Sequence, residues 1–202
     1  MTEDFGLAIR QSRMASVPFR VHPLGIEAQL TWLDVMNILI LMDNEPIGLF
    51  VEIGTAKGGC AQLVLARLAY DINLRFVTAE IAHVIDERIK TEAARFGGRA
   101  TLFQGDCFSA AFQELVRSDI AATTSRSALI FCDGGDKQKE MDFFAPFLRR
   151  GDFLMAHDYF PDQPDEKAPS RASVEAVCAK HGMQWAVPTH WPDGSLILLR
   201  KT

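Results

Sequence analysis

The sequence predicts a doubly wound α/β fold: seven strands in a mostly parallel sheet, with an antiparallel last strand. Two observations support this prediction. Short apolar runs alternate with stretches of helical periodicity from residue 49 onward, and such alternation produces parallel strands joined by right-handed crossovers. The apolar runs also end in polar residues, which is typical of open sheets that bind ligands at the carboxyl ends of their strands.

The stretch at residues 49–59 contains the most specific pattern. It reads L-F-V-E-I-G-T-A-K-G-G, an apolar strand that ends in a glycine-rich turn before a helical pattern. Glycines let the backbone turn tightly and approach a ligand closely. The dinucleotide fingerprint requires glycine where Ala56 stands, and the P-loop requires Ser or Thr directly after Gly-Lys, which the residues around Lys57 do not supply. With the acidic Glu52 in the strand, the turn favours a ligand that has an amino group and no phosphates.

The other elements follow in chain order, within one domain expected to span residues 1–202. Residues 1–45 are its N-terminal part: a loosely structured arm and then a helix at 26–42, which D-N-E-P at 43–46 terminates. Periodicity and breakers predict strands at 74–79, 100–103, 128–132 and 153–156, and helices at 81–96, 108–119, 138–149 and 171–181. A hairpin of two strands, 184–187 and 196–200, closes the chain.

Composition excludes several functional classes. Lys and Arg total 21 against 26 Asp and Glu, and a formal charge of −5 is unsuited to holding a nucleic-acid backbone. The four cysteines are isolated, which favours reduced thiols over disulfides or a zinc site. No signal segment is visible at the N-terminus, and the apolar stretch at 37–42 is far too short to cross a membrane. We therefore expect a cytoplasmic protein with no membrane or nucleic-acid partner.

The pattern Glu-x-Gly-x-x-x-Gly-Gly at residues 52–59 resembles the first motif of class I S-adenosylmethionine-dependent methyltransferases. The resemblance continues in the right order over residues 49–200. It implies a Rossmann-like sheet, S-adenosylmethionine as the cofactor and a small-molecule substrate. The cofactor-binding residues that follow from it are Glu52, Gly54, Thr55, Gly58, Gly59, Glu80, Asp106, Cys107 and Asp133.

Two of these acids suit an adenosine group by their positions. Glu80 ends the second strand, where a carboxylate can accept hydrogen bonds from both ribose hydroxyls. Asp106 follows the third strand, where it can accept from the adenine amino group, with Cys107 and Phe108 beside the ring. Each acid has a simpler alternative: a solvated strand end for Glu80, and a helix N-cap for Asp106 or Ser109.

Polar residues after the fourth and fifth strands narrow the resemblance. Asp133-Gly-Gly-Asp136 and His157-Asp158 look like the small-molecule O-methyltransferases related to macrocin, catechol and caffeoyl-coenzyme A methyltransferases, and like cephalosporin-hydroxylase-type proteins. The metal-dependent members imply a divalent cation, Mg²⁺ or Mn²⁺, held by Asp133, His157 and Asp158. Imidazole suits magnesium poorly and favours Mn, Fe or Zn. The alternative is a hydrogen-bonded pair of His157 and Asp158 at a strand end.

The general base is where the sequence departs from this group. Sugar-modifying members carry histidine three residues after the first acid, where Asp136 stands here. Catechol-type members carry lysine at that position, so Lys137 is one residue out of register. The candidate catalytic residues are therefore Asp136, Lys137 and His157, with a helix N-cap as the alternative role of Asp136. In the final hairpin loop, His190 and Trp191 are candidate substrate contacts, although a lid packed on the core suits Trp191 equally well.

The predicted activity is methyl transfer from S-adenosylmethionine to a hydroxyl group of a small molecule. Two alternatives stay open. One is a metal-dependent hydroxylase-like enzyme of the same fold, and the other is a cofactor-binding protein without transferase activity, which the lack of histidine at position 136 leaves possible. The methyl acceptor and the oligomeric state are not determined by the sequence, a homodimer being one option.

Overall fold

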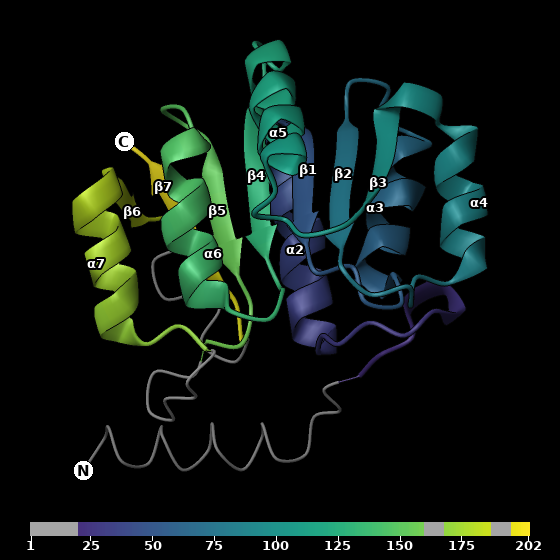
Figure 1. The fold of residues 1–202 in the computed structure, drawn as a ribbon, viewed down its shortest axis with the longest axis horizontal. Helices are drawn as coiled ribbons and strands as arrows, with labels where there is room; N and C mark the ends of the chain where they lie inside the picture. The colour runs from purple at the N-terminus through teal and green to yellow at the C-terminus, as the bar shows by residue number, and fades with distance from the viewer. Residues whose placement is uncertain (1–19, 160–167, 187–194) are drawn as a thin grey trace.

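The computed structural model describes residues 20–159, 168–186 and 195–202. These residues form a seven-stranded sheet of order β3-β2-β1-β4-β5-β7-β6 (Figure 1). The strands are β1 (Ile47–Ile53), β2 (Arg75–Glu80), β3 (Ala100–Gln104), β4 (Ser127–Cys132), β5 (Phe153–Ala156), β6 (Met183–Trp185) and β7 (Ile197–Lys201). β7 runs antiparallel to β5 and β6, and the other neighbouring strands are parallel. The predicted doubly wound sheet with an antiparallel last strand is confirmed.

Helices cover both faces of the sheet (Figure 1). One face packs against α2 (Trp32–Asn44), α3 (Gly59–Leu68) and α4 (Glu87–Arg95), and the other against α5 (Ala110–Ala122), α6 (Lys137–Phe144) and α7 (Arg171–His181). Short 3₁₀ helices are η1 (Pro23–Gly25), η2 (Gly97–Arg99) and η3 (Ala145–Phe147). Alternate residues of β1 serve the two cores, with Phe50 on the α3 side and Val51 on the α5 side. Among the described residues, no helix has both the length and the apolar character needed to cross a membrane.

Side-chain caps set the helix boundaries, and several of them differ from the predicted ones. α2 begins at 32 rather than 26, because Thr31 and Asp34 form a capping box. α4 begins at 87 rather than 81, where Asp86 caps it, and α5 begins at 110 rather than 108, where Ser109 caps it. α6 ends at 144 rather than 149, because Pro146 lies in η3.

Residues 20–31, here called the strap, pass over the start of α3. Val21 and Ala28 pair in an isolated antiparallel bridge. The backbone amide of Gly59 donates to the carbonyl oxygen of Glu27 at 3.1 Å. A Cβ atom on residue 59 would lie 2.5 Å from that oxygen, so glycine is what permits the contact.

The order of the strands fixes where a ligand can bind. β1 and β4 are neighbours at the centre of the sheet, and the helices that follow them, α3 and α6, lie on opposite faces. In doubly wound sheets such a reversal opens a crevice at the carboxyl ends of the strands. A ligand site is therefore expected in the crevice between the carboxyl ends of β1 and β4.

Candidate active site

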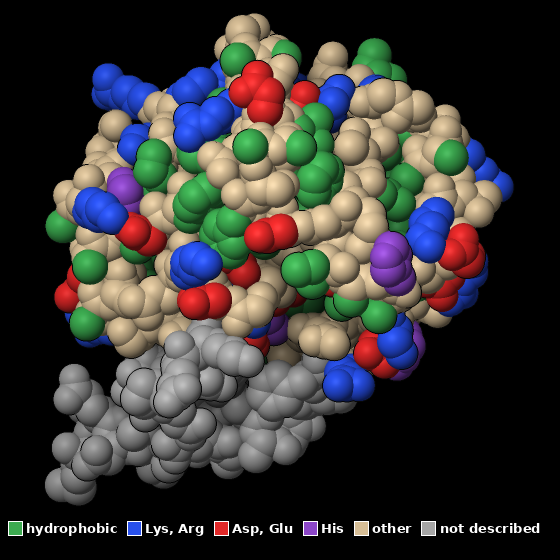
Figure 2. Space-filling model, viewed as in Figure 1, with side chains coloured by type: hydrophobic (Ala, Val, Ile, Leu, Met, Phe, Trp, Pro, Cys, Tyr) green, Lys and Arg blue, Asp and Glu red, His purple; other side chains and the backbone are tan. Residues whose placement is uncertain are grey.

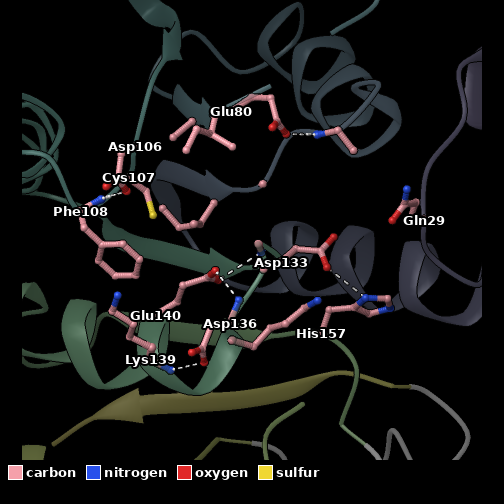
Figure 3. Close-up of a pocket in the computed structure, with 18 of the residues that line it drawn as sticks. Gln29, Glu80, Asp106, Cys107, Phe108, Asp133, Asp136, Lys139, Glu140 and His157 are labelled. Carbon is pink, nitrogen blue, oxygen red and sulfur yellow. Dashed lines mark hydrogen bonds and ion pairs between the residues drawn. The ribbon is translucent and has the colours of Figure 1, made fainter. Parts of the chain in front are cut away.

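A cavity of about 730 Å³ opens at the carboxyl ends of the central strands (Figure 3). Its walls come from the turn after β1, the end of β2, and the loops after β3, β4 and β5. Cavities of roughly 300–1,000 Å³ are typical of small-molecule and cofactor sites. Glu80 and Asp106 line one part of it, and Asp133 and His157 line another (Figure 3).

The glycine turn brings the ends of β1 and β4 into contact. Gly54 has φ +88°, and a Cβ atom there would lie 2.5 Å from the carbonyl oxygen of Asp133. Gly54 and Ala56 line the cavity. Thr55, Gly58 and Gly59 are absent from its lining, and the amide of Gly59 is used by the strap. The start of α3 is therefore covered by backbone, unlike the open helix N-terminus that binds phosphate.

Glu80 fixes the glycine turn from the neighbouring strand. Its Oε2 accepts the backbone amide of Ala56 at 2.7 Å, and its Oε1 accepts that of Ala82 at 2.9 Å. Each carboxylate oxygen can accept a second hydrogen bond. The side chain is half-buried at the cavity wall, so it can receive a pair of ligand hydroxyls while it holds the turn.

The loop after β3 forms the wall beyond Glu80. Asp106 Oδ1 accepts the amide of Phe108 at 2.9 Å, and Ser109 rather than Asp106 caps α5. This decides between the two capping alternatives and leaves Asp106 exposed at the cavity. Cys107 is half-buried beside it, and burial raises the pKa of its thiol to about 12, so the thiol is neutral.

A cluster of charged side chains occupies the other part of the cavity. His157 Nδ1 lies 3.0 Å from Asp133 Oδ1 and 3.2 Å from Asp158 Oδ1. Lys137 Nζ lies 2.7 Å from Asp158 Oδ2. The loops after β4 and β5 thus bring together four of the residues that the sequence singled out. The imidazole itself is buried, whereas Asp158 is partly exposed.

Burial and pairing set the charges in this cluster. Burial alone would lower the pKa of His157, but the carboxylates of Asp133, Asp34 and Asp158 raise it to about 10. Burial also opposes the charge of Lys137, yet Asp158 and Asp133 raise its pKa above the ordinary value. Burial raises the pKa of Asp133, although His157 and Lys137 oppose the shift. At neutral pH the cluster therefore contains two cations between carboxylates.

Solved structures are similar to this chain, whereas no family model and no curated protein matches it. The apo structure of CmcI-N160 has a TM-score of 0.61 at 14% identity, covering 88% of this chain and 74% of that one. The citrinin polyketide synthase CMeT domain has a TM-score of 0.56 at 12% identity, covering 84% and 52%. The O-methyltransferase NcsB1 from neocarzinostatin biosynthesis, in complex with S-adenosylmethionine and 2-hydroxy-5-methyl naphthoic acid, has a TM-score of 0.50 at 13% identity, covering 77% and 49%.

The fold is that of the class I methyltransferases. The expected Rossmann-like methyltransferase architecture is confirmed. The chain spans about half the length of two of these structures, 52% and 49%. At such low identities the similarity establishes the fold, and the reaction must be argued from the site.

Within this methyltransferase fold, Asp136 and Glu140 shape the loop after β4. Asp136 caps α6 by accepting the amide of Lys139 at 2.9 Å, which is the alternative role considered for it. Glu140, which the sequence analysis missed, accepts the amides of Gly134 at 3.1 Å and of Asp136 at 3.3 Å. Burial raises the pKa of Glu140 to about 7. An acid in the first turn of a helix that follows a Gly-Gly loop was the available signal.

Glu52 is not among the residues that line the cavity. It shares the face of β1 with Phe50, because side chains alternate along a strand, and it is buried on the α3 side. The hydroxyl of Thr78 donates to its Oε2 at 2.6 Å, and Thr78 is itself hydrogen-bonded to Thr55. Burial raises the pKa of Glu52 to about 8, so the side chain is largely neutral at pH 7.

Glu52→Gln is expected to make stability less dependent on pH. The folded pKa of about 8 lies above the ordinary value of 4.5, so the folded state binds this proton more tightly than the unfolded chain. Its contribution to stability is complete below pH 4.5 and is lost as pH rises towards 8. We expect Glu52→Gln to unfold in urea like wild type at pH 4, and to be more stable by about 4 kcal/mol at pH 8. Equal differences at both pH values would contradict a neutral Glu52.

The charged cluster has the donors of a cation site but already contains its own cations. Asp133, His157 and Asp158 each offer a ligand atom, all within 4.8 Å of one another. However, Lys137 pairs with Asp158, and the imidazole nitrogen that faces Asp133 is the atom a metal would need. A metal ion would have to displace the proton on that nitrogen. In this structure the same side chains form an ion-pair cluster, and the Mg²⁺ or Mn²⁺ site stays a prediction.

Two predicted substrate contacts belong to a part of the chain that is not described, and Asp34, like Glu140, was not predicted. His190 and Trp191 lie outside the described residues. Asp34, at the start of α2, faces the buried side of His157, where its Oδ2 lies 3.5 Å from Nε2. The only local sign of Asp34 in the sequence was its capping-box spacing from Thr31, which predicts a helix start and no chemistry at the site.

The surface carries charged side chains of both signs. On the face seen in Figure 2, where α5 and α6 lie, Lys and Arg side chains are interspersed with Asp and Glu.

Proposed function

We propose that the protein transfers a methyl group from S-adenosylmethionine to a hydroxyl group of a small molecule. The observation that carries this proposal is a single cavity with two chemically different ends. One end offers hydrogen-bond acceptors for an adenosine group, Glu80 and Asp106, and the other contains the carboxylate of Asp133 held against His157. The resemblance of the motif and the class I fold support the same reaction.

The first end fits the cofactor by its shape and its acceptors. Gly54 has no side chain to collide with the backbone of Asp133 and Gly134, so the turn after β1 and the loop after β4 can lie close together at the cavity. Glu80 has acceptor capacity for two ribose hydroxyls, and Asp106 with Cys107 lies where the base would be held. When bound, S-adenosylmethionine supplies an activated methyl group. Among the predicted cofactor residues, Glu52, Thr55, Gly58 and Gly59 would act by shaping the turn.

The second end offers a proton acceptor. Lys137 and His157 are both protonated at neutral pH, so neither is ready to take a proton from a hydroxyl. Asp136 uses its carboxylate to cap α6. Asp133 lines the cavity, and burial raises its pKa towards the range useful for a general base. We therefore assign proton removal to Asp133, with His157 fixing its orientation.

We expect this chemistry to be independent of a divalent cation. Lys137 and His157 already balance the carboxylates that would bind one. Exhaustive dialysis against EDTA should leave methyl release unchanged and shift the melting temperature by less than about 2 °C, because a bound metal adds stability that its removal takes away. Stoichiometric metal in elemental analysis, with activity lost to EDTA and restored by Mn²⁺, would show that the metal-dependent alternative is right.

A second candidate function is cofactor binding without transfer. It is favoured by one observation, that the residue in the register of the expected base, Asp136, is used as a helix cap. Incubation with S-adenosylmethionine labelled in the methyl group, across a panel of sugars, phenols and polyketide alcohols, separates the two. Transfer of label to any hydroxyl supports the methyltransferase. Cofactor binding with no transfer across the panel supports the binding protein.

A further inference from the structure

Asp34 is a buried acidic side chain that makes more contacts than the cap of its own helix requires. Its Oδ2 accepts from the amide of Thr31 at 2.9 Å and from the Thr31 hydroxyl at 2.7 Å, which completes the capping box of α2. It accepts two further hydrogen bonds, from the amide of Ser195 to Oδ1 at 2.9 Å and from the Ser195 hydroxyl to Oδ2 at 3.0 Å. Ser195 is 161 residues away, next to β7. A cap alone requires only the contacts with Thr31.

Asp34 has a third partner, His157. The Nε2 atom of the ring is buried and has no hydrogen-bond partner among the described residues, and Asp34 Oδ2 faces it at 3.5 Å. The opposite nitrogen, Nδ1, faces Asp133 at 3.0 Å. A ring with a carboxylate at each nitrogen cannot turn over without giving up both ion pairs. Asp34 is not part of the cavity lining, and of the side chains that it contacts His157 is the one that lines the cavity.

We propose that Asp34 is a positioning residue. Through the imidazole of His157 it keeps the Nδ1–H group directed at Asp133, and so holds that carboxylate at the second end of the cavity, where the methyl acceptor would bind. The inference rests on the proposed methyl transfer. The hydrogen bonds of Asp34 with Thr31 and Ser195, together with its ion pair with His157, also connect three segments: the start of α2, the start of β7 and the end of β5. The orientation of His157 and Asp133 therefore depends on a residue of α2, the helix that precedes the first strand of the sheet.

The test compares Asp34→Asn with Asp43→Asn. Both substitutions remove one carboxylate from α2, but Asp43 lies at the exposed end of the helix and pairs with Arg67. The first readout is the ¹⁵N spectrum of the histidine rings at about pH 7.5, with His157→Gln used to assign the signal. In wild type and Asp43→Asn, the His157 ring should carry hydrogen on both nitrogens. In Asp34→Asn, that signal should change to a neutral ring or to two exchanging forms.

The second readout separates positioning from general damage. With an acceptor from the hydroxyl panel, Asp34→Asn should lower kcat by about tenfold or more, while affinity for S-adenosylhomocysteine changes less than about twofold. Asp43→Asn should change neither. A folded Asp34→Asn with an unchanged ring spectrum, or with rate and cofactor affinity reduced by the same factor, would overturn the proposal.

If Asp34→Asn does not fold, Asp34→Ser, which retains a small hydrogen-bonding side chain in the capping box, takes its place. The wild-type spectrum is decisive by itself, since a His157 ring without hydrogen on Nε2 contradicts the pairing with Asp34 whatever the variants do. If wild type fails to bind S-adenosylhomocysteine, the proposed function fails, whereas the ring spectrum still reports on the pairing.

Discussion

Asp133→Asn is expected to lower the rate of methyl transfer by about 10²–10⁴-fold, the usual contribution of a general base. The amide has nearly the same shape but cannot take up the hydroxyl proton. Cofactor affinity should change little, because the proton moves only as the acceptor oxygen attacks. The rate is measured with labelled S-adenosylmethionine and an acceptor from the hydroxyl panel, and the affinity for S-adenosylhomocysteine by calorimetry.

Asp136→Asn is the matched control. Asparagine caps helices as well as aspartate does, so the cap of α6 and the stability should survive. We expect less than about a threefold change in rate, well below the effect of a lost general base. A large loss with Asp136→Asn and none with Asp133→Asn would instead assign proton removal to Asp136.

Gly54→Ala should remove cofactor binding and destabilise the protein. The residue has φ +88°, and the added Cβ would lie 2.5 Å from the carbonyl oxygen of Asp133 and 2.7 Å from the Cα of Gly134. These are backbone atoms of the adjoining loop, which cannot rotate away. Strain at such a position costs about 1–3 kcal/mol before the collision is counted, so a loss of about 3 kcal/mol or more in urea unfolding is expected.

Gly98→Ala is the control for Gly54→Ala, since a Cβ on Gly98 meets no atom within 4 Å. It should unfold within about 0.5 kcal/mol of wild type, as surface substitutions generally do. Affinity for S-adenosylhomocysteine should fall at least about tenfold in Gly54→Ala and stay unchanged in Gly98→Ala. Wild-type stability and binding in Gly54→Ala would show that the β1 and β4 ends are further apart than described.

The sheet could be predicted from sequence because its signals are local. Apolar runs, glycine breakers and the alternation of strands with helices each depend on a few neighbouring residues. Together they predicted a doubly wound, mostly parallel sheet that binds ligands at the carboxyl ends of its strands. Helix starts were less accurate. The periodicity of α2 continues back to residue 26, but the capping box of Thr31 and Asp34 decides where the helix begins.

The side chains of the site were only partly predictable. Asp133, Lys137, His157 and Asp158 meet because strand ends converge on one edge of a parallel sheet. The pairing of Asp34 with Ser195 spans 161 residues and leaves no local pattern. Glu52 shows the opposite case: alternation with Phe50 along β1 was visible in the sequence and would have directed it towards α3.

The most direct test of the proposed function is to measure which ligand binds at the first end of the cavity, the end lined by Glu80 and Asp106. Titration calorimetry should show that the protein binds S-adenosylhomocysteine and does not bind NAD, because the strap covers the amide of Gly59 that a pyrophosphate would use. Glu80→Ala should weaken the binding of S-adenosylhomocysteine by about 1–3 kcal/mol, the cost of losing a charged hydrogen-bond partner. Tight binding of NAD, or S-adenosylhomocysteine affinity that is unaffected by Glu80→Ala, would contradict the account.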